Sequence, residues 1–268
     1  MLLALTRELS PAIVHCELTH REREAIDVDL ARAQHAAYEA CLRDASCRVE
    51  ALAAGPDMPD SVFIEDTAVV FDEVAIITRP GAASRRAETA GVADALRKYR
   101  PLHQMEPPAT ADGGDVLVIG HQILIGRSSR TNDAGIDEMR RVLTPFGYQV
   151  TAIDVRGCLH LKSAATAVGD DLVLMNPAWL PSWPPVSSGP FASFDRIEVH
   201  PDEPWAANAL RVGDRIIYPM SFPHTLERLR RRGLHVATVD ASEVAKAEGG
   251  VTCCSLILGL ESLERFPL

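Results

Sequence analysis

Pairs of short apolar segments, each joined by a few polar residues, recur along the chain. Four such pairs span residues 67–79, 115–127, 163–176 and 208–220. Two apolar runs around a short polar turn are typical of a β-hairpin. The turns follow one another at intervals of roughly 44 to 49 residues, a period that is typical of repeat proteins. The pattern therefore predicts a chain built from hairpin repeats.

A fifth hairpin is predicted to be divided between the two ends of the chain. Residues 253–258 resemble the first strand of each hairpin, and residues 3–7 resemble the second strands at 75–79 and 123–127. A ring that the two termini close would leave only short, protected strand edges, as in a propeller. We therefore expect five repeats in a closed ring. The alternative is an ordinary α/β domain whose hairpins happen to be evenly spaced.

Helical patterns alternate with the hairpins. They cover residues 21–45, 84–99, 133–143 and 223–232. Polar side chains satisfy the free amide groups at a helix start, so we expect Ser84, with Glu88 nearby, to cap the second helix. Thr131 or Asn132 is expected to cap the third. Residues 177–194 are rich in proline, which leaves no room for a long helix and predicts an irregular connection.

Length and charge narrow the class of protein. The chain has 268 residues, a length that allows one large domain or two small ones, and we expect a single domain over residues 1–268. Its formal net charge of -10 argues against binding to nucleic acid. No stretch approaches the roughly 20 apolar residues that cross a bilayer, and Arg7 and Glu8 come too early for a signal peptide. We expect a cytoplasmic protein without membrane contact. Its six cysteines have no spacing typical of a disulfide framework or a zinc site.

Three residues that could perform nucleophilic chemistry lie where the first strand of a repeat begins, and in a ring such positions converge on the axis. Cys253 follows two glycines, and a thiolate is a strong nucleophile. His160 could donate and accept protons near neutral pH. Asp112 could orient His160. Each has a structural alternative: the Cys253-Cys254 pair could be core packing, His160 could be structural, and Asp112 could belong to a tight glycine turn.

Carboxylates and arginines occupy related positions. Glu65 and Asp66, with Asp60 before them, would suit a planar guanidinium group. A pair of carboxylates could also act as in glycosidases or bind a divalent metal, but the cysteine and histidine in register favour the guanidinium. Arg85 and Arg130 could bind a substrate carboxylate, although exposed arginines at helix starts are common.

These residues form motifs that resemble the dimethylarginine dimethylaminohydrolases, within the amidinotransferase and arginine deiminase (pentein) superfamily. The motifs are Phe63-Ile64-Glu65-Asp66-Thr67, Arg79-Pro80-Gly81-Ala82, Ser84-Arg85-Arg86, Asp112-Gly113-Gly114-Asp115-Val116, Arg130-Thr131-Asn132, Leu159-His160-Leu161-Lys162-Ser163 and Thr252-Cys253-Cys254-Ser255. The resemblance runs nearly end to end. It implies a five-bladed, pseudo-symmetric α/β propeller of ββαβ units around an axial active site.

The resemblance also implies roles for individual residues. Cys253 would be the nucleophile, His160 the general acid and base, and Asp112 its partner. Glu65 and Asp66 would hold the guanidinium, and Arg85 and Arg130 the α-carboxylate. The remaining pocket residues would be Leu18, on a mobile lid, with Asp60, Phe63, the backbone of Ala247, and Glu248. Glu248 stands where the family pattern leads us to expect aspartate, which could move a contact to the substrate amine.

The implied reaction converts N-omega-methylated arginine to citrulline and methylamine or dimethylamine through a covalent thiouronium on Cys253. It needs no metal and no other cofactor, although a thiolate beside an imidazole could capture zinc. An arginine deiminase-type hydrolase of unmethylated arginine is the alternative within this class, and a non-catalytic binder of arginine-like ligands is the alternative outside it. The expected partner is a small guanidino substrate. The oligomeric state stays open, with a homodimer as one outcome.

Overall fold

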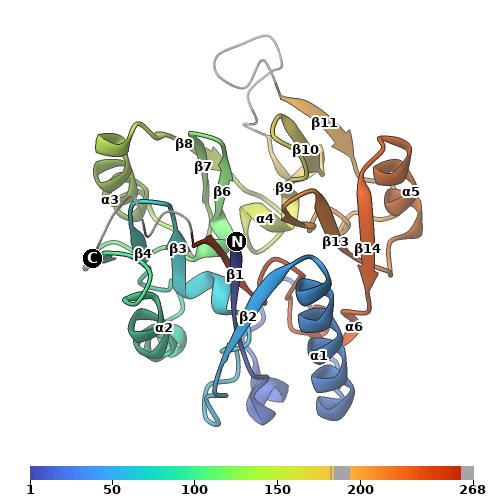
Figure 1. The fold of residues 1–268 in the computed structure, drawn as a ribbon, viewed down its shortest axis with the longest axis horizontal. Helices are drawn as coiled ribbons and strands as arrows, with labels where there is room; N and C mark the ends of the chain where they lie inside the picture. The colour runs from blue at the N-terminus through green and yellow to red at the C-terminus, as the bar shows by residue number, and fades with distance from the viewer. Residues whose placement is uncertain (182, 184–193, 261–268) are drawn as a thin grey trace.

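Five small sheets surround a common axis in the computed structural model, which describes residues 1–181, 183 and 194–260 (Figure 1). Each sheet has three strands, in the orders β15-β1-β2, β3-β4-β5, β6-β7-β8, β9-β10-β11 and β12-β13-β14. The strands are β1 (Leu2–Arg7), β2 (Cys47–Leu52), β3 (Ala68–Val70), β4 (Ala75–Ile77), β5 (Leu102–Gln104), β6 (Val116–Ile119), β7 (Gln122–Arg127), β8 (Gln149–Asp154), β9 (Ala165–Ala167), β10 (Leu172–Met175), β11 (Asp195–Glu198), β12 (Leu210–Val212), β13 (Arg215–Pro219), β14 (His235–Val239) and β15 (Leu256–Gly259).

All five sheets share one pairing scheme. The first two strands form the antiparallel hairpin that the hydrophobic pattern predicts, and the third strand returns parallel to the second. The fifth sheet is assembled from both ends of the chain, because β15 pairs antiparallel with β1 at Leu2↔Gly259 and Leu5↔Leu256. The prediction of five repeats closed by the termini is therefore confirmed.

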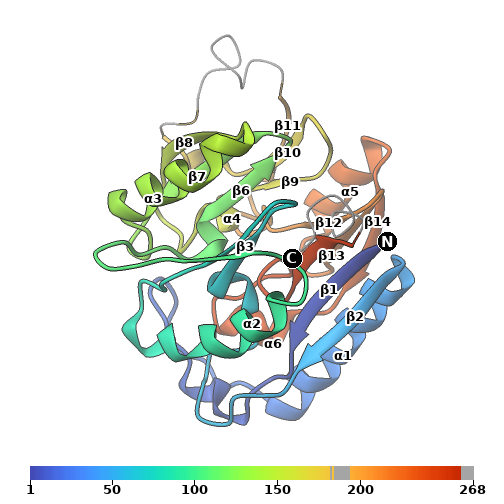
Figure 2. The same cartoon turned by 60° about the vertical axis from the view of Figure 1, so that its left-hand side comes forward.

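The longer helices lie on the outside of the ring (Figures 1 and 2). They are α1 (Val28–Asp44), α2 (Thr89–Leu96), α3 (Asp133–Leu143) and α5 (Pro223–Arg231), while α4 (Leu161–Ala164) and α6 (Ser242–Lys246) are short. The helix α1 begins later than the sequence pattern suggested, because the side chain of Asp27 accepts hydrogen bonds from the amides of Asp29 and Leu30 and caps the first turn.

The two predicted caps have different outcomes. Asn132 caps α3 as predicted, with its side-chain oxygen 2.8 Å from the amide of Gly135. Ser84 caps no helix, and that prediction is wrong. It lies inside a 3-10 helix, Ala83–Glu88, that precedes α2, and its hydroxyl instead donates to Glu17. A pattern of residue types cannot distinguish a cap from a polar residue one step inside the helix.

The proline-rich segment 177–194 is described only in part. It opens with a 3-10 helix, Pro177–Trp179, and Leu180 and Phe194 pack into the core beside β9 and β10. The rest of the expected irregular connection, residues 182 and 184–193, lies outside the described residues.

Buried side chains form five clusters around the ring, filling the spaces between sheets and outer helices. In one of them, Ile136 and Met139 of α3 pack against Ile123 and Ile125 of β7. The first strands of the sheets face inward and line an axial cavity of about 660 Å³. No helix among the described residues is long and apolar enough to span a membrane.

Candidate active site

A tight turn precedes the first strand of each of four sheets, and these turns carry the candidate residues. The turns are the 3-10 helix Ile64–Thr67, the 3-10 helix Gly113–Asp115, the short helix α4 that His160 precedes, and the turn at residues 251–254 before β15. Asp115 links two of them, because its carboxylate accepts from the amide of Leu161 at 2.9 Å. The start of α4, and with it His160, is thereby fixed against the turn before the sheet β6-β7-β8.

One small cavity brings most of the predicted residues together. Its free volume is about 20 Å³. Its lining consists of Glu17, Asp60, Phe63, Asp66, Arg85, Arg130, Leu159, His160, Ala247, Glu248, Gly249 and Cys253. These residues come from several segments that are far apart in the sequence. The closed ring of sheets brings those segments together.

The structure distinguishes the two adjacent cysteines. Cys253 is partly exposed and lines the cavity, and its sulfur lies 3.4 Å from the amide nitrogen of Gly250. Cys254 is buried in the hydrophobic core beside Tyr38 and Val251 and does not line this cavity. Both cysteines lie in the turn before β15, not in the strand itself as the apolar pattern suggested.

His160 is surrounded by carboxylates. Its Nε2 lies 3.1 Å from Asp112 Oδ2, and its Nδ1 lies 3.8 Å from Asp66 Oδ1. Burial alone would lower the pKa of His160, but the negative charges of Asp66, Asp112 and Asp115 outweigh it and raise the pKa to about 9. The imidazole is therefore protonated at neutral pH in the ligand-free protein and can act as an acid.

The Cys253 thiol, in contrast to His160, is favoured in its neutral form. Burial, together with the negative charges of Glu65 and Asp66, raises its pKa to about 12. At neutral pH the ligand-free site therefore holds a neutral thiol and an imidazolium. A cation bound next to the sulfur would favour the thiolate.

Asp66 is held by a buried arginine. Arg85 Nη1 lies 2.6 Å from Asp66 Oδ2, and its other nitrogens bond Glu88 at 2.8 to 3.2 Å. Burial would raise the pKa of Asp66, but the positive charges of His160 and Arg85 hold it below its usual range. Asp66 also accepts from the amide of Gly114 at 3.0 Å. Its carboxylate is thus a fixed negative charge at the cavity wall.

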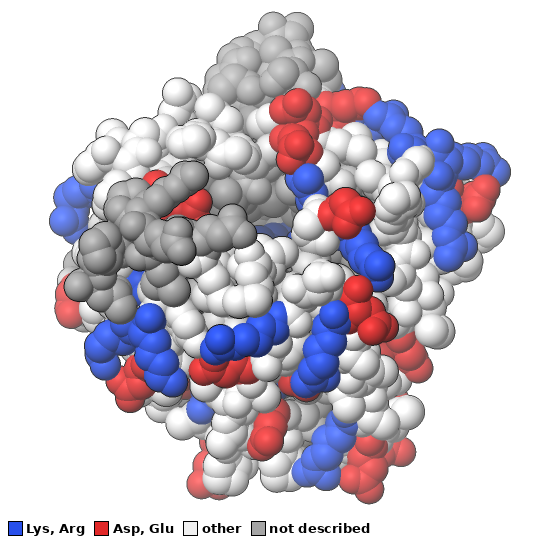
Figure 3. Space-filling view, in the orientation of Figure 1, with Lys and Arg blue, Asp and Glu red and all other residues white. Residues whose placement is uncertain are grey.

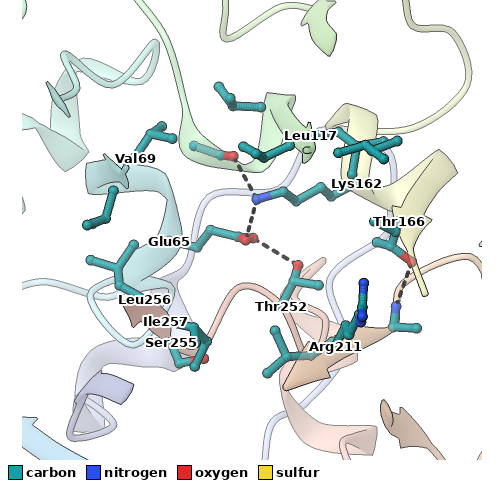
Figure 4. Close-up of a pocket in the computed structure, with 18 of the residues that line it drawn as sticks. Glu65, Val69, Leu117, Lys162, Thr166, Arg211, Thr252, Ser255, Leu256 and Ile257 are labelled. Carbon is teal, nitrogen blue, oxygen red and sulfur yellow. Dashed lines mark hydrogen bonds and ion pairs between the residues drawn. The ribbon is translucent and has the colours of Figure 1, made fainter. Parts of the chain in front are cut away.

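Glu65 points away from this cavity, in contrast to the expectation that it shares a guanidinium with Asp66. It lines the axial cavity (Figure 4), where its carboxylate accepts from Lys162 Nζ at 2.6 Å and from Thr252 Oγ1 at 2.8 Å. Sequence reasoning missed Lys162 and also Asn208, whose side-chain amide bonds Thr252. The position of Asn208 at the start of its hairpin, in register with the other candidates, was a signal for it.

Arg130, Asp60 and Phe63 also line the small cavity. Arg130 is nearly buried, with Nη1 4.0 Å from Asp112 Oδ2 and Nη2 3.3 Å from Thr19 Oγ1. The carboxylate of Asp60 accepts from the amide of Glu17 at 3.1 and 3.3 Å, and burial raises its pKa. Phe63 packs over Gly249, where an added Cβ would lie 2.1 Å from the ring.

Glu248 binds the loop that contains Leu18. Its carboxylate accepts from the amides of Thr19, His20 and Arg21 at 3.0, 2.5 and 2.6 Å. Its backbone has a φ of 59°, which is rare for a residue with a side chain. Leu18 itself is partly buried against the core and does not line the small cavity. In this conformation the carboxylate of Glu248 holds the loop, while Glu248 also lines the small cavity.

Three potential metal-ligand atoms lie close together in the site. Among the described residues, Asp66, Asp112 and His160 offer ligand atoms within 4.8 Å of one another.

Outside the site, Figure 3 shows Lys and Arg alternating with Asp and Glu on one face of the molecule, which is hollowed near its middle.

Comparison with known proteins identifies the family. A family model described as "N,N dimethylarginine dimethylhydrolase, eukaryotic" matches residues 13–182. The N(G),N(G)-dimethylarginine dimethylaminohydrolase of Streptomyces coelicolor is 42% identical over 95% of this chain and 96% of that protein. The protein of the same name from Pseudomonas aeruginosa is 36% identical over 83% of this chain and 86% of that protein.

Solved structures agree in fold. The dimethylarginine dimethylaminohydrolase of Pseudomonas aeruginosa, as a variant complexed with citrulline, superposes with a TM-score of 0.87 at 32% identity and covers 95% of this chain and 98% of its own. The N-terminal domain of ArgZ, an arginine dihydrolase from cyanobacteria, has a TM-score of 0.83 at 17% identity, covers 96% of this chain and 98% of its own, and supports the fold alone. The fold is the pentein α/β propeller. Within that superfamily the chain belongs to the dimethylarginine dimethylaminohydrolase family of hydrolases.

Proposed function

We propose that this hydrolase converts dimethylarginine and monomethylarginine to citrulline and dimethylamine or methylamine, with residues 1–268 forming one catalytic domain. The observation that carries the proposal is the meeting of Cys253, His160 and Asp66 in one small cavity. A nucleophile, an acid and a fixed negative charge for a guanidinium are what this reaction requires. The relatives named for this activity support the same substrate.

Charged side chains would bind the two charged ends of the substrate. The guanidinium would lie against Asp66, and Arg130 would bind the α-carboxylate, since its contacts within the protein are longer than those of Arg85. Arg85 would then act mainly by holding Asp66 in place. It would attract the α-carboxylate of the substrate more weakly than Arg130 does. Asp60 and the carbonyl of Ala247 would accept from the α-amine, and Phe63 would cover the methylene groups. Leu18 and Glu248 would close the loop over the bound substrate.

The chemistry would proceed in two halves. The substrate cation stabilises the Cys253 thiolate, whose proton leaves to solvent, and the sulfur adds to the guanidinium carbon. His160 gives its proton to the methylated nitrogen, the C–N bond breaks, and a thiouronium cation remains on Cys253. Neutral His160 then takes a proton from water as the oxygen adds to the same carbon. The C–S bond then breaks, the sulfur leaves with the bonding electrons as a thiolate, the hydroxyl proton passes to solvent, and citrulline is released. Asp112 keeps His160 oriented throughout.

The test is release of citrulline from asymmetric dimethylarginine, monomethylarginine and arginine. Cys253→Ser and His160→Ala should lose turnover, while Cys254→Ser should keep it, because Cys254 lies in the core and not at the cavity. Mass spectrometry of quenched reactions should detect the covalent adduct on Cys253. Consumption of arginine alone would establish the deiminase-type alternative. Binding without hydrolysis would show a non-catalytic binder.

Two further proposals concern the whole protein. We propose a cytoplasmic location, from the acidic composition and the absence of a long apolar stretch in the sequence. We also propose a homodimer as the assembly to test, by sedimentation at several protein concentrations. A monomer at all concentrations would contradict it.

A further inference from the structure

Lys162, Glu65 and Thr252 form a chain of polar contacts at the wall of the axial cavity (Figure 4). Lys162 Nζ lies 2.6 Å from Glu65 Oε1 and 3.3 Å from the carbonyl of Gly113. The other oxygen of Glu65 accepts from the hydroxyl of Thr252 at 2.8 Å. Glu65 and Thr252 are only 7% and 4% exposed. None of these contacts involves a group that the proposed mechanism uses.

This chain of contacts reaches the nucleophile by two routes. Thr252 directly precedes Cys253, and its hydroxyl lies 3.9 Å from the sulfur. The amide of Glu65 also donates to the carbonyl of Cys253 at 3.1 Å. The carboxylate of Glu65 is thus separated from the sulfur by a single hydroxyl group. A like charge nearby disfavours the ionised form of an acid and so raises its pKa.

Lys162 is the cation that faces this carboxylate. We infer that Lys162 is a positioning residue for catalysis, because its charge offsets that of Glu65 and so allows the Cys253 thiolate to form. The inference rests on the proposed role of Cys253 as nucleophile. The simpler alternative is that Lys162 only offsets the cost of burying Glu65, which is the usual function of a buried ion pair. The two possibilities differ in whether the reactivity of the sulfur changes when the charges are removed.

Several other charged groups surround Cys253, and they are the same in the wild type and in variants of Lys162. Those that line the same cavity are Glu17, Asp60, Asp66, Arg85, Arg130, His160 and Glu248. Tyr38 and Cys254 lie in the hydrophobic core next to Cys253, and each also interacts electrostatically with it. A change at Lys162 leaves each of these in place, so its effect on the sulfur can be measured by difference.

The experiment measures the rate at which iodoacetamide alkylates Cys253 between pH 7 and pH 10, with the modified peptide identified by mass spectrometry. Because only the thiolate reacts, a shift of one pKa unit changes the rate about tenfold at a fixed pH. Lys162→Met should slow alkylation about tenfold, since Glu65 then opposes the thiolate alone. Glu65→Gln should accelerate it by a similar factor, since Lys162 is then unopposed.

The double variant Lys162→Met with Glu65→Gln supplies the decisive control. It removes both charges and should return the rate to within about threefold of the original, as should Lys162→Arg, which keeps the charge. Equal alkylation rates in all four variants would overturn the inference and leave Lys162 a purely structural role. If Lys162→Met does not fold, as judged by circular dichroism, Glu65→Gln alone decides: an unchanged rate overturns the inference. Alkylation requires no turnover, so failure of the proposed function would appear separately, as absence of citrulline.

Discussion

Three buried carboxylates near Cys253 are each held by a different cation. Glu65 pairs with Lys162, Asp66 with Arg85, and Asp112 with His160. Burial would lower the pKa of Arg85, but the charges of Asp66 and Glu88 outweigh it and raise the pKa, so Arg85 keeps its charge, whereas His160 can lose its own. His160 is therefore the residue whose charge should couple catalysis to stability.

The raised pKa of His160 predicts a pH-dependent stability. The folded value is about 9 and the ordinary value 6.5, so the folded state binds the proton more tightly. This contribution is fully present below about pH 6.5 and is lost as the pH rises to about 9. We expect the wild type to lose roughly 2 to 4 kcal/mol over this range relative to His160→Gln. Urea unfolding at a series of pH values measures it, and parallel stability curves for the two proteins would contradict it.

Gly114 is the residue whose lack of a side chain leaves space for His160. A Cβ added there would lie 2.6 Å from His160 Nδ1 and 2.9 Å from Asp66 Oδ1. Gly114→Ala should therefore displace both groups and reduce kcat/KM for dimethylarginine by about 100-fold or more, because catalysis tolerates little misplacement. Gly91→Ala is the control, since Gly91 lies in helix α2 and a Cβ there would meet only Arg7 Nη2, at an ordinary contact distance of 3.8 Å. Comparable activity losses in both variants would argue against the steric explanation.

At the scale of the element, the sequence predicted the hairpins and outer helices better than the turns between them. Apolar residues repeat with the period of a strand or a helix because one face of the element is buried. These elements can therefore be predicted from the order of apolar and polar residues. The short helical turns before the inner strands carry no such period. Adjacent residues on a turn of helix point in directions more than 90° apart, so Glu65 and Asp66 face different cavities although both lie at the predicted position. No pattern in the sequence indicates which of the two faces the substrate.

Asn132 is the element-scale determinant of α3. Its side-chain oxygen accepts from the amides of Gly135 and Thr110, and its side-chain nitrogen donates to the carbonyl of Pro108. Asn132→Ala should lower the free energy of unfolding by about 1 to 2 kcal/mol, because the cap and the loop contacts are lost together. Ser84→Ala, the wrongly predicted cap, should change it by less than about 0.5 kcal/mol. Urea denaturation of both variants tests the assignment, and an equal loss in the two would refute it.

At the scale of the whole molecule, the sequence predicted closure of the ring because the two ends each supply half of a hairpin. It could not predict the contacts that join neighbouring repeats, since these involve side chains with no periodic signal. Arg100 is such a residue, with only 2% of its surface exposed. Its guanidinium donates to the carbonyls of Phe71, Tyr99 and Gly259 at 2.8, 2.6 and 2.6 Å. It therefore connects the repeat of sheet β3-β4-β5 to β15, the strand that closes the ring.

Loss of Arg100 should thus weaken closure of the ring without touching the active site. Arg100→Ala leaves three carbonyl groups without their cationic donor, and we expect a loss of about 2 to 4 kcal/mol in the free energy of unfolding. For a chain of this size that corresponds to a melting temperature lower by roughly 4 to 16 °C. Arg97→Ala is the matched control, because its side chain is 66% exposed and pairs only with exposed Asp94. Well below the melting temperature, Arg100→Ala should keep the citrulline-forming rate of the wild type, since it contacts no residue of the cavity. An unchanged melting temperature would show that β15 is held by its pairing with β1 alone.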